Sequence, residues 1–234
     1  MNVRQNLRRW HIWLGWIIGI PFLIWTVSGL VMVARPIEAV RGEDLLGEAP
    51  GLASGLAPVA PSIGPRPVST LKLEQRANGP RWIVTYADGE SRLADAVTGR
   101  LLPPLTAADA VQAVEARYAG TAKVGGVDRI SGDNPPIDFR RPVHAWRVSM
   151  SDGTRFYVHA ATGEILAKRT GWWRIYDFMW GLHIMDLETR EDAHNPLLIG
   201  FALVSLVTII LAIALLPMTI RRRAKKSGAA PPQE

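Results

Sequence analysis

The sequence predicts an α+β membrane protein in which two transmembrane helices flank a folded domain made of one helix and antiparallel strands. Two apolar stretches, 14–33 and 196–216, are each long enough, at a rise of about 1.5 Å per residue, to cross a hydrocarbon core of about 30 Å. Between them, apolar and polar residues alternate in short runs, which is the pattern of half-buried strands.

The basic residues predict which side of the membrane each part occupies. Arg4, Arg8 and Arg9 precede the first stretch, and five cations follow the second, namely Arg221, Arg222, Arg223, Lys225 and Lys226. Because cytoplasmic flanks carry the excess of Lys and Arg, we expect both termini in the cytoplasm and residues 35–194 on the other side. These flanks account for the net charge of +6, so the remainder is nearly neutral and a nucleic-acid-binding protein is excluded.

The alternative for the first stretch is a cleaved signal peptide. Signal peptides have an apolar core of about 7 to 15 residues that ends at a small-x-small cleavage site. Here the apolar run is longer, and the sequence around Ala34 (MVARP) is a poor site. A retained anchor is therefore favoured.

The absence of cysteine limits the chemistry that the chain can carry. Disulfides, iron–sulfur clusters, thiolate zinc sites and covalently attached haem are excluded, so a redox centre would have to be held by histidine or methionine. The sequence also lacks a nucleophile motif, an H-E-x-x-H motif and a phosphate-binding loop. Hydrolases and nucleotide-dependent enzymes are therefore unsupported.

An internal repeat organises the central region. The segment WIVTYADGESRLADAVTGRLL, which starts at Trp82, aligns without a gap with WRVSMSDGTRFYVHAATGEIL, which starts at Trp146. Each copy predicts a meander with two turns, at Asp-Gly (Asp88-Gly89, Asp152-Gly153) and at Thr-Gly (Thr98-Gly99, Thr162-Gly163).

One helix is predicted between the two copies. Thr106 is a suitable N-cap with Asp109 three residues later, and Gly120 is expected to end the helix. Its apolar stripe comprises Ala107, Ala110, Val111, Val114 and Tyr118. The first copy lacks such a helix, because residues 42–67 are rich in Gly, Pro and Ala and predict an extended linker.

The second copy resembles the PepSY domain, a small α+β module of exported bacterial proteins. The resemblance rests on the order of helix and strands and on the D-G and T-G-E-I-L motifs. The placement between two apolar stretches resembles PepSY-associated transmembrane (PepSY-TM) proteins, here in a short, two-helix form. The resemblance is best over residues 106–166, moderate for the flanking stretches and partial for the first copy. It implies a bacterial inner-membrane protein with residues 35–194 in the periplasm, where the PepSY-like domain lies.

The predicted order of segments follows from these patterns: a cytoplasmic N-terminus (1–11), a transmembrane helix (12–34), a Gly/Pro/Ala-rich linker (35–67), a first half-repeat (68–105), a second repeat (106–170), an interfacial aromatic helix with an acidic loop (171–194), a second transmembrane helix (195–219) and a basic cytoplasmic tail (220–234).

His11 lies at the cytoplasmic end of the first stretch, with Gly15 and Gly19 on the same helical face. A flat ligand such as haem b could lie against these glycines while the imidazole binds its iron. Two alternatives stay open. Gly15 and Gly19 could admit a neighbouring helix, and His11 could be an interfacial residue among the belt tryptophans Trp10, Trp13 and Trp16.

The resemblance adds a second haem ligand, since some family members are siderophore or ferric reductases that bind haem b through membrane histidines. His11, in R-R-W-H-x-W-L-G, and His183, in W-G-L-H-I-M-D, match the histidine positions of the family. Those reductases have at least four spans, whereas this chain has two. His11 and His183 should lie at opposite faces of a core of about 30 Å, so one chain cannot clamp one haem with both.

A homodimer would pair each histidine with its copy and create two haem positions, between which electrons could cross the membrane. The competing hypothesis is a non-enzymatic, membrane-anchored module that binds a protein, a peptide or a metal complex such as a periplasmic iron complex, or that modulates a peptidase. Another membrane subunit could also be the partner. No nicotinamide or flavin site is evident.

The remaining histidines give weaker signals. His194, with Asp186 and Asp192, could hold a divalent ion, but a solvated acidic loop, with His194 as a helix cap or surface residue, explains the same residues. His144 and His159 lie in or beside strands of the second copy. Because Phe156 and Val158 take the apolar face of their strand, His159 is expected to face solvent.

Overall fold

The computed structural model describes residues 3–227, with side chains of the last helix described up to Pro217. The chain divides into a membrane unit, formed by the described parts of 1–34 and 176–234, and a soluble unit, formed by 35–175. Of the predicted basic tail, residues 220–227 belong to the last helix and 228–234 lie outside the described residues.

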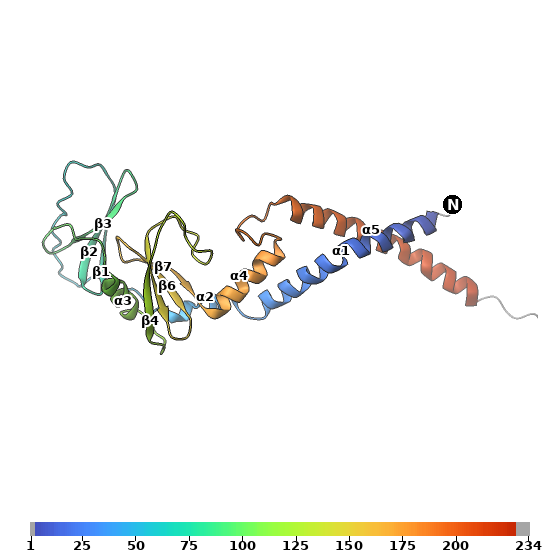
Figure 1. Ribbon diagram of the computed structural model, residues 1–234, viewed down its shortest axis with the longest axis horizontal. Coiled ribbons are helices and arrows are strands. Elements are labelled where there is room, and N and C mark those ends of the chain that lie inside the picture. The colour runs from blue at the N-terminus through green and yellow to red at the C-terminus, as the bar shows by residue number, and fades with distance from the viewer. Residues whose placement is uncertain (1–2, 228–234) are drawn as a thin grey trace, which may run out of the picture. The chain divides into compact units, whose positions relative to one another are not determined.

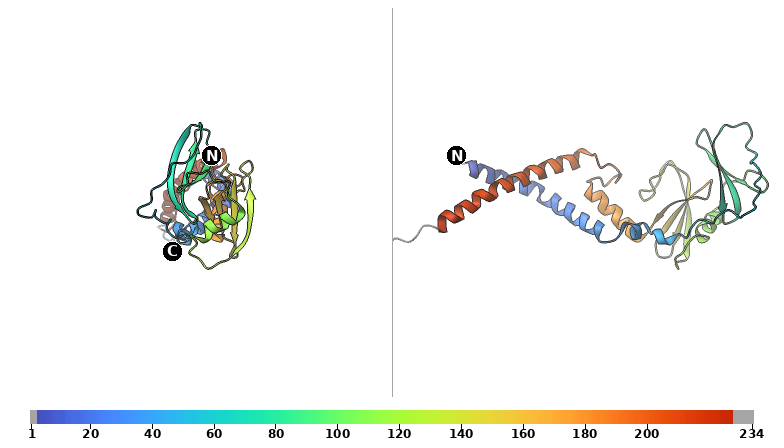
Figure 2. Two further views of the ribbon diagram at one scale, coloured as in Figure 1. Left: turned by 90° about the vertical axis from the view of Figure 1, so that its left-hand side faces the viewer. Right: turned by 180° about the vertical axis from the view of Figure 1, so that it is seen from behind.

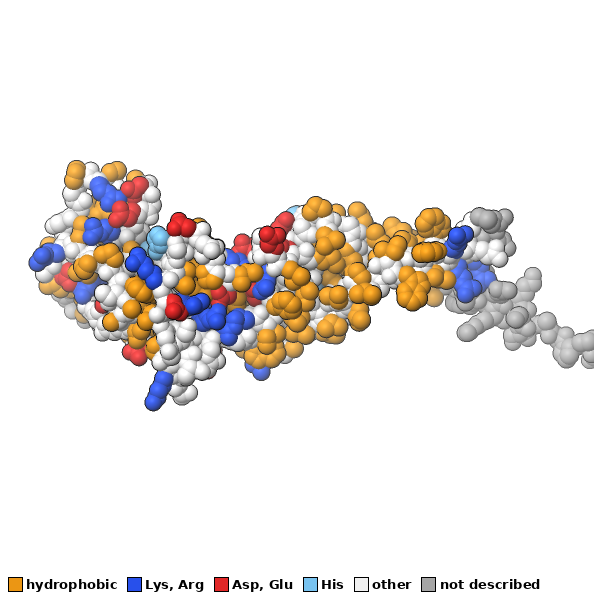
Figure 3. All heavy atoms as spheres, viewed as in Figure 1, with side chains coloured by type: hydrophobic (Ala, Val, Ile, Leu, Met, Phe, Trp, Pro, Cys, Tyr) orange, Lys and Arg blue, Asp and Glu red, His pale blue; other side chains and the backbone are white. Residues whose placement is uncertain are grey.

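The membrane unit contains two long apolar helices, α1 (Val3–Val33) and α5 (Pro196–Ser227), each long and apolar enough to cross a membrane. α1 continues through Pro21. The two helices pack against each other where they cross (Figure 1), with the rings of Phe22 and Phe201 6.4 Å apart. On the face seen in Figure 3, apolar side chains cover much of α1 and of the part of α5 up to Pro217, as the two predicted spans require.

The first part of the soluble unit is a three-stranded antiparallel sheet in the order β1-β2-β3, which Figure 2 shows from two further sides. Its strands are β1 (Val68–Arg76), β2 (Gly79–Tyr86) and β3 (Ser91–Asp95). The preceding segment forms short helices, α2 (Ile37–Arg41) and η1 (Glu43–Leu45), and then an extended stretch.

That stretch is extended as expected, but it packs on the first sheet. The indole N–H of Trp82 donates to the Val59 carbonyl at 2.8 Å, and Ser62 N–H donates to the Gly99 carbonyl at 2.8 Å. Gly99, at φ +71°, has no room for a side chain, because a Cβ would lie 2.5 Å from the Ala60 carbonyl oxygen.

The second sheet is four-stranded and antiparallel, in the order β4-β5-β6-β7, and the helix α3 (Ala107–Glu115) contacts it. Its strands are β4 (Val124–Ile130), β5 (Ala145–Met150), β6 (Arg155–His159) and β7 (Ile165–Arg169). The Thr106–Asp109 capping box is confirmed. The predicted end at Gly120 is wrong, because α3 stops at Glu115 and Tyr118 packs edge-on against Phe156, with ring centroids 5.7 Å apart.

One face of the second sheet forms the core that the alternating pattern predicts. Fully buried side chains of α3, β5 and β6 meet there, namely Ala110, Val114, Val148, Met150, Phe156 and Val158. This burial ties the helix to the sheet and makes the apolar stripe of α3 its docking face.

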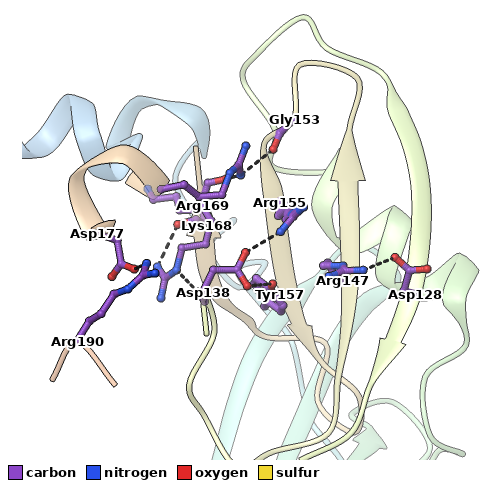
Figure 4. A network of polar contacts seen from close by, with 11 residues as sticks. Asp128, Asp138, Arg147, Gly153, Arg155, Tyr157, Lys168, Arg169, Asp177 and Arg190 are labelled. Atoms are coloured by element: carbon purple, nitrogen blue, oxygen red, sulfur yellow. Dashed lines mark hydrogen bonds and ion pairs between the residues drawn. The ribbon is translucent and has the colours of Figure 1, made fainter. Parts of the chain in front are cut away.

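The opposite face of the second sheet is also buried, which the sequence did not predict. Tyr157 is fully buried and stacks on Phe139, with ring centroids 4.4 Å apart. Asp138, only 6% exposed, accepts hydrogen bonds from the Tyr157 hydroxyl at 2.7 Å and from Arg155 at 3.0 Å (Figure 4). The segment before β5 therefore covers this face with the ring of Phe139 and with the carboxylate of Asp138, which accepts two side-chain hydrogen bonds.

The two ends of the soluble unit lie next to each other. The Arg35 guanidinium lies 4.4 Å above the ring of Trp172, in the helix α4 (Gly171–His183), and the Thr170 hydroxyl donates to the Val40 carbonyl at 3.0 Å. The soluble unit is therefore entered and left at one place, as a domain inserted between two spans requires.

Candidate functional site

His183, at the C-terminal end of α4, packs against α1 inside the membrane unit. Its imidazole stacks on the indole of Trp25, with ring centroids 4.5 Å apart and planes inclined by 22°. Gly29 makes room for the ring, because a Cβ at this position would lie 3.2 Å from His183 Cε1. We call the set Trp25, Ser28, Gly29 and His183 the histidine socket.

The hydrogen bonds of the socket determine which nitrogen of His183 carries the proton. Nδ1 lies 3.1 Å from the Trp25 carbonyl oxygen, which can only accept, so this contact favours the neutral tautomer in which Nδ1 is the donor. The buried Ser28 hydroxyl lies 3.2 Å from Nδ1 and donates to the same carbonyl at 2.9 Å. Nε2 then keeps its lone pair and makes no hydrogen bond within residues 3–227.

This arrangement matches the usual geometry of a metal-binding histidine. Such residues donate one ring N–H to a carbonyl or a carboxylate, which orients the ring and makes the other nitrogen a better ligand. The sequence suggested His183 but not its partners in α1. The signal that could have found them is the run W-T-V-S-G at 25–29, which places a serine and a glycine one turn after an aromatic residue.

The loop after α4 is tied back onto that helix and holds its end in place. Asp177, 5% exposed, accepts a hydrogen bond from Arg190 at 2.7 Å (Figure 4), and the Trp180 indole donates to the Arg190 carbonyl at 3.0 Å. Gly181 allows this approach, since a Cβ there would lie 2.8 Å from Arg190 Cγ. Breaking a buried pair of this kind costs about 3–5 kcal/mol, so the loop is firmly anchored.

His11 lies on α1, on the face that also bears Gly15 and Gly19. A Cβ at either glycine would meet nothing within 4 Å, so α5 does not pack closely against these two positions. The Nδ1 atom of His11 is buried and has no hydrogen-bond partner within the described part of the chain. The two glycines are therefore uncovered in a single chain, and His11 lacks the orienting bond that His183 has.

The two histidines are far apart within one chain. His11 precedes Trp25, the contact of His183, by 14 residues on α1, which corresponds to about 21 Å along the helix axis. Two axial nitrogens on one iron must lie about 4 Å apart, since each Fe–N bond is about 2 Å. The structure does not bring His11 and His183 together.

Asp186 and Asp192, two residues of the predicted metal site, accept hydrogen bonds from their own loop. The carboxylate of Asp186 accepts bonds from the Thr189 hydroxyl and from the N–H groups of Thr189, Asp192 and Glu191, which hold its pKa well below the ordinary value. Asp192 accepts from the His194 N–H at 2.8 Å. Within residues 3–227, no three His, Asp or Glu side chains gather as a metal-binding group. The site with His194 stays a prediction from sequence.

The other two histidines, His144 and His159, accept hydrogen bonds from backbone N–H groups of the soluble unit. His159 Nδ1 accepts from the N–H groups of Ala161 and Thr162, at 3.1 and 3.2 Å, and burial lowers the pKa of His159. His144 Nδ1 accepts from the Gly132 N–H at 3.1 Å. The prediction of a solvent-facing His159 is wrong, because the segment around Phe139 covers that face of the sheet.

Comparison with known proteins gives one match. A family model described as "PepSY-associated TM region" matches residues 8–226, which is nearly the whole chain. No curated protein and no solved structure matches the chain significantly.

Proposed function

Because this chain belongs to the PepSY-associated TM family, we propose that it is a haem-b-binding protein of the bacterial inner membrane that passes electrons across the bilayer in iron or siderophore uptake. His183 and His11 would hold the haem iron through their imidazole nitrogens. The observation that carries the proposal is the hydrogen bond of His183 Nδ1 to the Trp25 carbonyl, which leaves Nε2 available as a ligand.

The histidine socket fits the chemistry of such a ligand. The Trp25 carbonyl selects the tautomer of His183, the Trp25 ring sets the plane of the imidazole, and Gly29 leaves space beside it. The anchored loop at Arg190 keeps the end of α4 from moving away. Haem b would supply a reversible one-electron couple at this position. This chain contributes a fixed nitrogen donor in apolar surroundings, which favour binding of an apolar macrocycle.

A homodimer would complete the site. His11 and His183 lie too far apart to share one iron. Gly15 and Gly19 are uncovered in one chain, and the buried Nδ1 atom of His11 has no partner within the described residues. A twofold axis along the spans would bring His11 next to its copy and His183 next to its copy. This gives a four-helix bundle with one pair of histidines toward each membrane face. Both termini would lie in the cytoplasm and the soluble unit in the periplasm.

An absorption spectrum of the detergent-extracted, full-length protein tests the proposal. After expression with sufficient haem, we expect a Soret band in the wild-type protein and the loss of about half of its absorbance in His183→Ala, which removes one of the two haem positions. His11→Ala should remove about half of the absorbance if the two positions are independent. His194→Ala, which removes an exposed histidine of the same loop, is the matched control and should keep the band.

Two results would contradict this function. One is a haem-free wild-type protein that is correctly folded by circular dichroism. The other is a His183→Ala variant with an unchanged spectrum. Where the wild-type protein does contain haem, the haem can be reduced with dithionite and a ferric siderophore complex added. Reoxidation of the haem would then test electron transfer directly.

A further inference from the structure

A cavity of about 650 Å³ lies within the soluble unit, between the first sheet, α3 and the Thr-Gly turn before β7. Pockets for small ligands and peptide side chains typically measure about 300–1,000 Å³. We call it the inter-sheet cavity. It is lined by the end of β1, by α3 and by the turn at Thr162 and Gly163.

Thr162 presents an unused polar group at this cavity. The residue is 4% exposed, and its hydroxyl has no hydrogen-bond partner within the described residues. In the other Thr-Gly turn, the hydroxyl of Thr98 donates to the Asp95 carboxylate at 3.2 Å, and Thr98 does not line the cavity. A buried hydroxyl without a partner costs about 1–3 kcal/mol, so the Thr162 hydroxyl points to a polar ligand.

The open edge of β1 also borders the cavity. β1 is an edge strand, and a two-residue turn joins Arg76 to its partner Gly79 in β2. Hydrogen-bonded and non-hydrogen-bonded pairs alternate from that turn, so the N–H and C=O groups of Leu73 and Gln75 point away from β2. Pro80, which has no N–H, stands opposite Gln75, in agreement with this register. Leu73 and Gln75 both line the cavity.

The lining of the cavity combines apolar and charged side chains, and the charges balance. The apolar part includes Leu73, Leu93, Leu102, Leu105 and Ile165. Three arginines (Arg76, Arg81, Arg117) are balanced by three carboxylates (Glu74, Asp109, Glu164). Such a lining selects neither an anion nor a cation, whereas it suits a neutral chain of amide groups with an apolar side chain.

We propose that the inter-sheet cavity binds a short extended peptide, which adds as a further strand to the open edge of β1. The peptide backbone exchanges hydrogen bonds with Leu73 and Gln75, one of its polar groups bonds to the Thr162 hydroxyl, and an apolar side chain fills the leucine-lined part. This site uses none of the residues of the histidine socket, so peptide binding can be tested independently of haem binding.

The test begins with affinity selection on the full-length, detergent-solubilised protein. The probe is a pool of pentapeptides, N-acetylated, C-amidated and randomised at all positions, and mass spectrometry identifies the bound members. The best binder is then resynthesised in two series, with N-methyl groups on alternate peptide nitrogens. Because alternate N–H groups of a strand point to opposite edges, one series should abolish binding and the other should leave it intact.

Three variants locate the peptide on the protein. Thr162→Val removes only the hydroxyl and should weaken binding about threefold to tenfold, with an unchanged or raised unfolding temperature. Gln75→Pro removes one outward-facing N–H of an edge strand without touching the β1–β2 ladder, and should weaken binding at least about tenfold. Thr98→Val is the matched control, which alters the other Thr-Gly turn and should leave the affinity unchanged.

Each contrary outcome overturns the proposal. A pool without any enriched peptide would do so, as would two N-methyl series that bind equally well. Unchanged affinity in Thr162→Val, or preferential binding of a small organic molecule that leaves hydrogen exchange at Leu73 and Gln75 unaltered, would assign the cavity to a different ligand class. The far-UV circular dichroism spectrum, measured in parallel, shows whether a variant has damaged the fold.

Discussion

Asp95 and His159 hold the two Thr-Gly turns of the soluble unit in the same manner. Asp95 Oδ1 accepts from the N–H groups of Val97 and Thr98, both at 2.9 Å, and His159 Nδ1 accepts from Ala161 and Thr162. An acceptor at the end of β3 and of β6 thus fixes each turn. In the second turn that acceptor is an imidazole, which loses its accepting lone pair when it is protonated.

The soluble unit should lose stability in mild acid because of His159. Burial lowers its pKa below the ordinary value of 6.5, so the unfolded chain takes up the proton first as the pH falls. The contribution of neutral His159 to the free energy of unfolding is complete above about pH 6.5 and declines below that pH. We expect His159→Asn to flatten this decline, since Asn accepts the same bonds and does not titrate. Asn is preferred to Asp because Glu164 lies nearby and would repel a second carboxylate.

Hydrogen exchange of the full-length protein between pH 7 and 5 measures this effect, read from the amides of β6. His144→Asn, which changes the other histidine of this sheet, is the control and should retain most of the wild-type decline, because burial, and not the charge of His144, is the main cause that lowers the pKa of His159. An equally steep decline in His159→Asn would show that other groups cause it.

Removal of the Tyr157 hydroxyl should destabilise the soluble unit. Burial, together with the bond to Asp138, raises the pKa of Tyr157 to about 12, so the hydroxyl remains a donor to that carboxylate at all physiological pH values. Tyr157→Phe should cost about 1.5–3 kcal/mol, as is usual for a hydrogen bond to a charged group. The free energy of unfolding from hydrogen exchange of β5 and β6 checks this. Tyr118→Phe, whose hydroxyl makes no bond within the described residues, should stay near wild type.

A side chain at Gly29 should displace His183 from its socket. Even a Cβ there would lie 3.2 Å from the imidazole, so Gly29→Val must push the ring off Trp25. If His183 binds haem, the Soret absorbance per protein should fall by about half, because the position at His11 is left intact. Gly200→Val is the matched control in the other long helix, because a Cβ at Gly200 meets nothing within 4 Å. Equal spectra of the two variants would speak against the socket as the ligand site.

Larger side chains at Gly15 and Gly19 should affect only contacts between chains. A Cβ at either position meets nothing within 4 Å in one chain, so Gly15→Leu and Gly19→Leu should leave the fold of the monomer intact. In a homodimer they should shift the equilibrium toward monomer and reduce the haem held at His11. Analytical ultracentrifugation in detergent, with Gly200→Leu as the control, decides between these outcomes. A dimer fraction that none of the variants changes would place the contact elsewhere.

Features that depend on neighbours in the sequence were predictable. The two spans follow from about 20 consecutive apolar residues, the start of α3 from Thr106 and Asp109, and the turns from Asp-Gly and Thr-Gly pairs, because each involves residues only a few positions apart. The predicted helix end at Gly120 was wrong for the same reason, because it was inferred from a neighbouring residue alone. In the structure α3 ends at Glu115, and Tyr118 packs on Phe156, a contact between residues far apart in the sequence.

The sequence by itself determined that the chain has two apolar helices, a capped helix and alternating strands, because these depend on local periodicity and composition. Only the tertiary structure decided that His183 lies against the Trp25 carbonyl, that Phe139 covers the second face of a sheet and that Thr162, with an unpaired hydroxyl, lines the same cavity as the edge of β1. These contacts join residues up to 158 positions apart, and no local pattern encodes which distant group fills the space beside a given side chain.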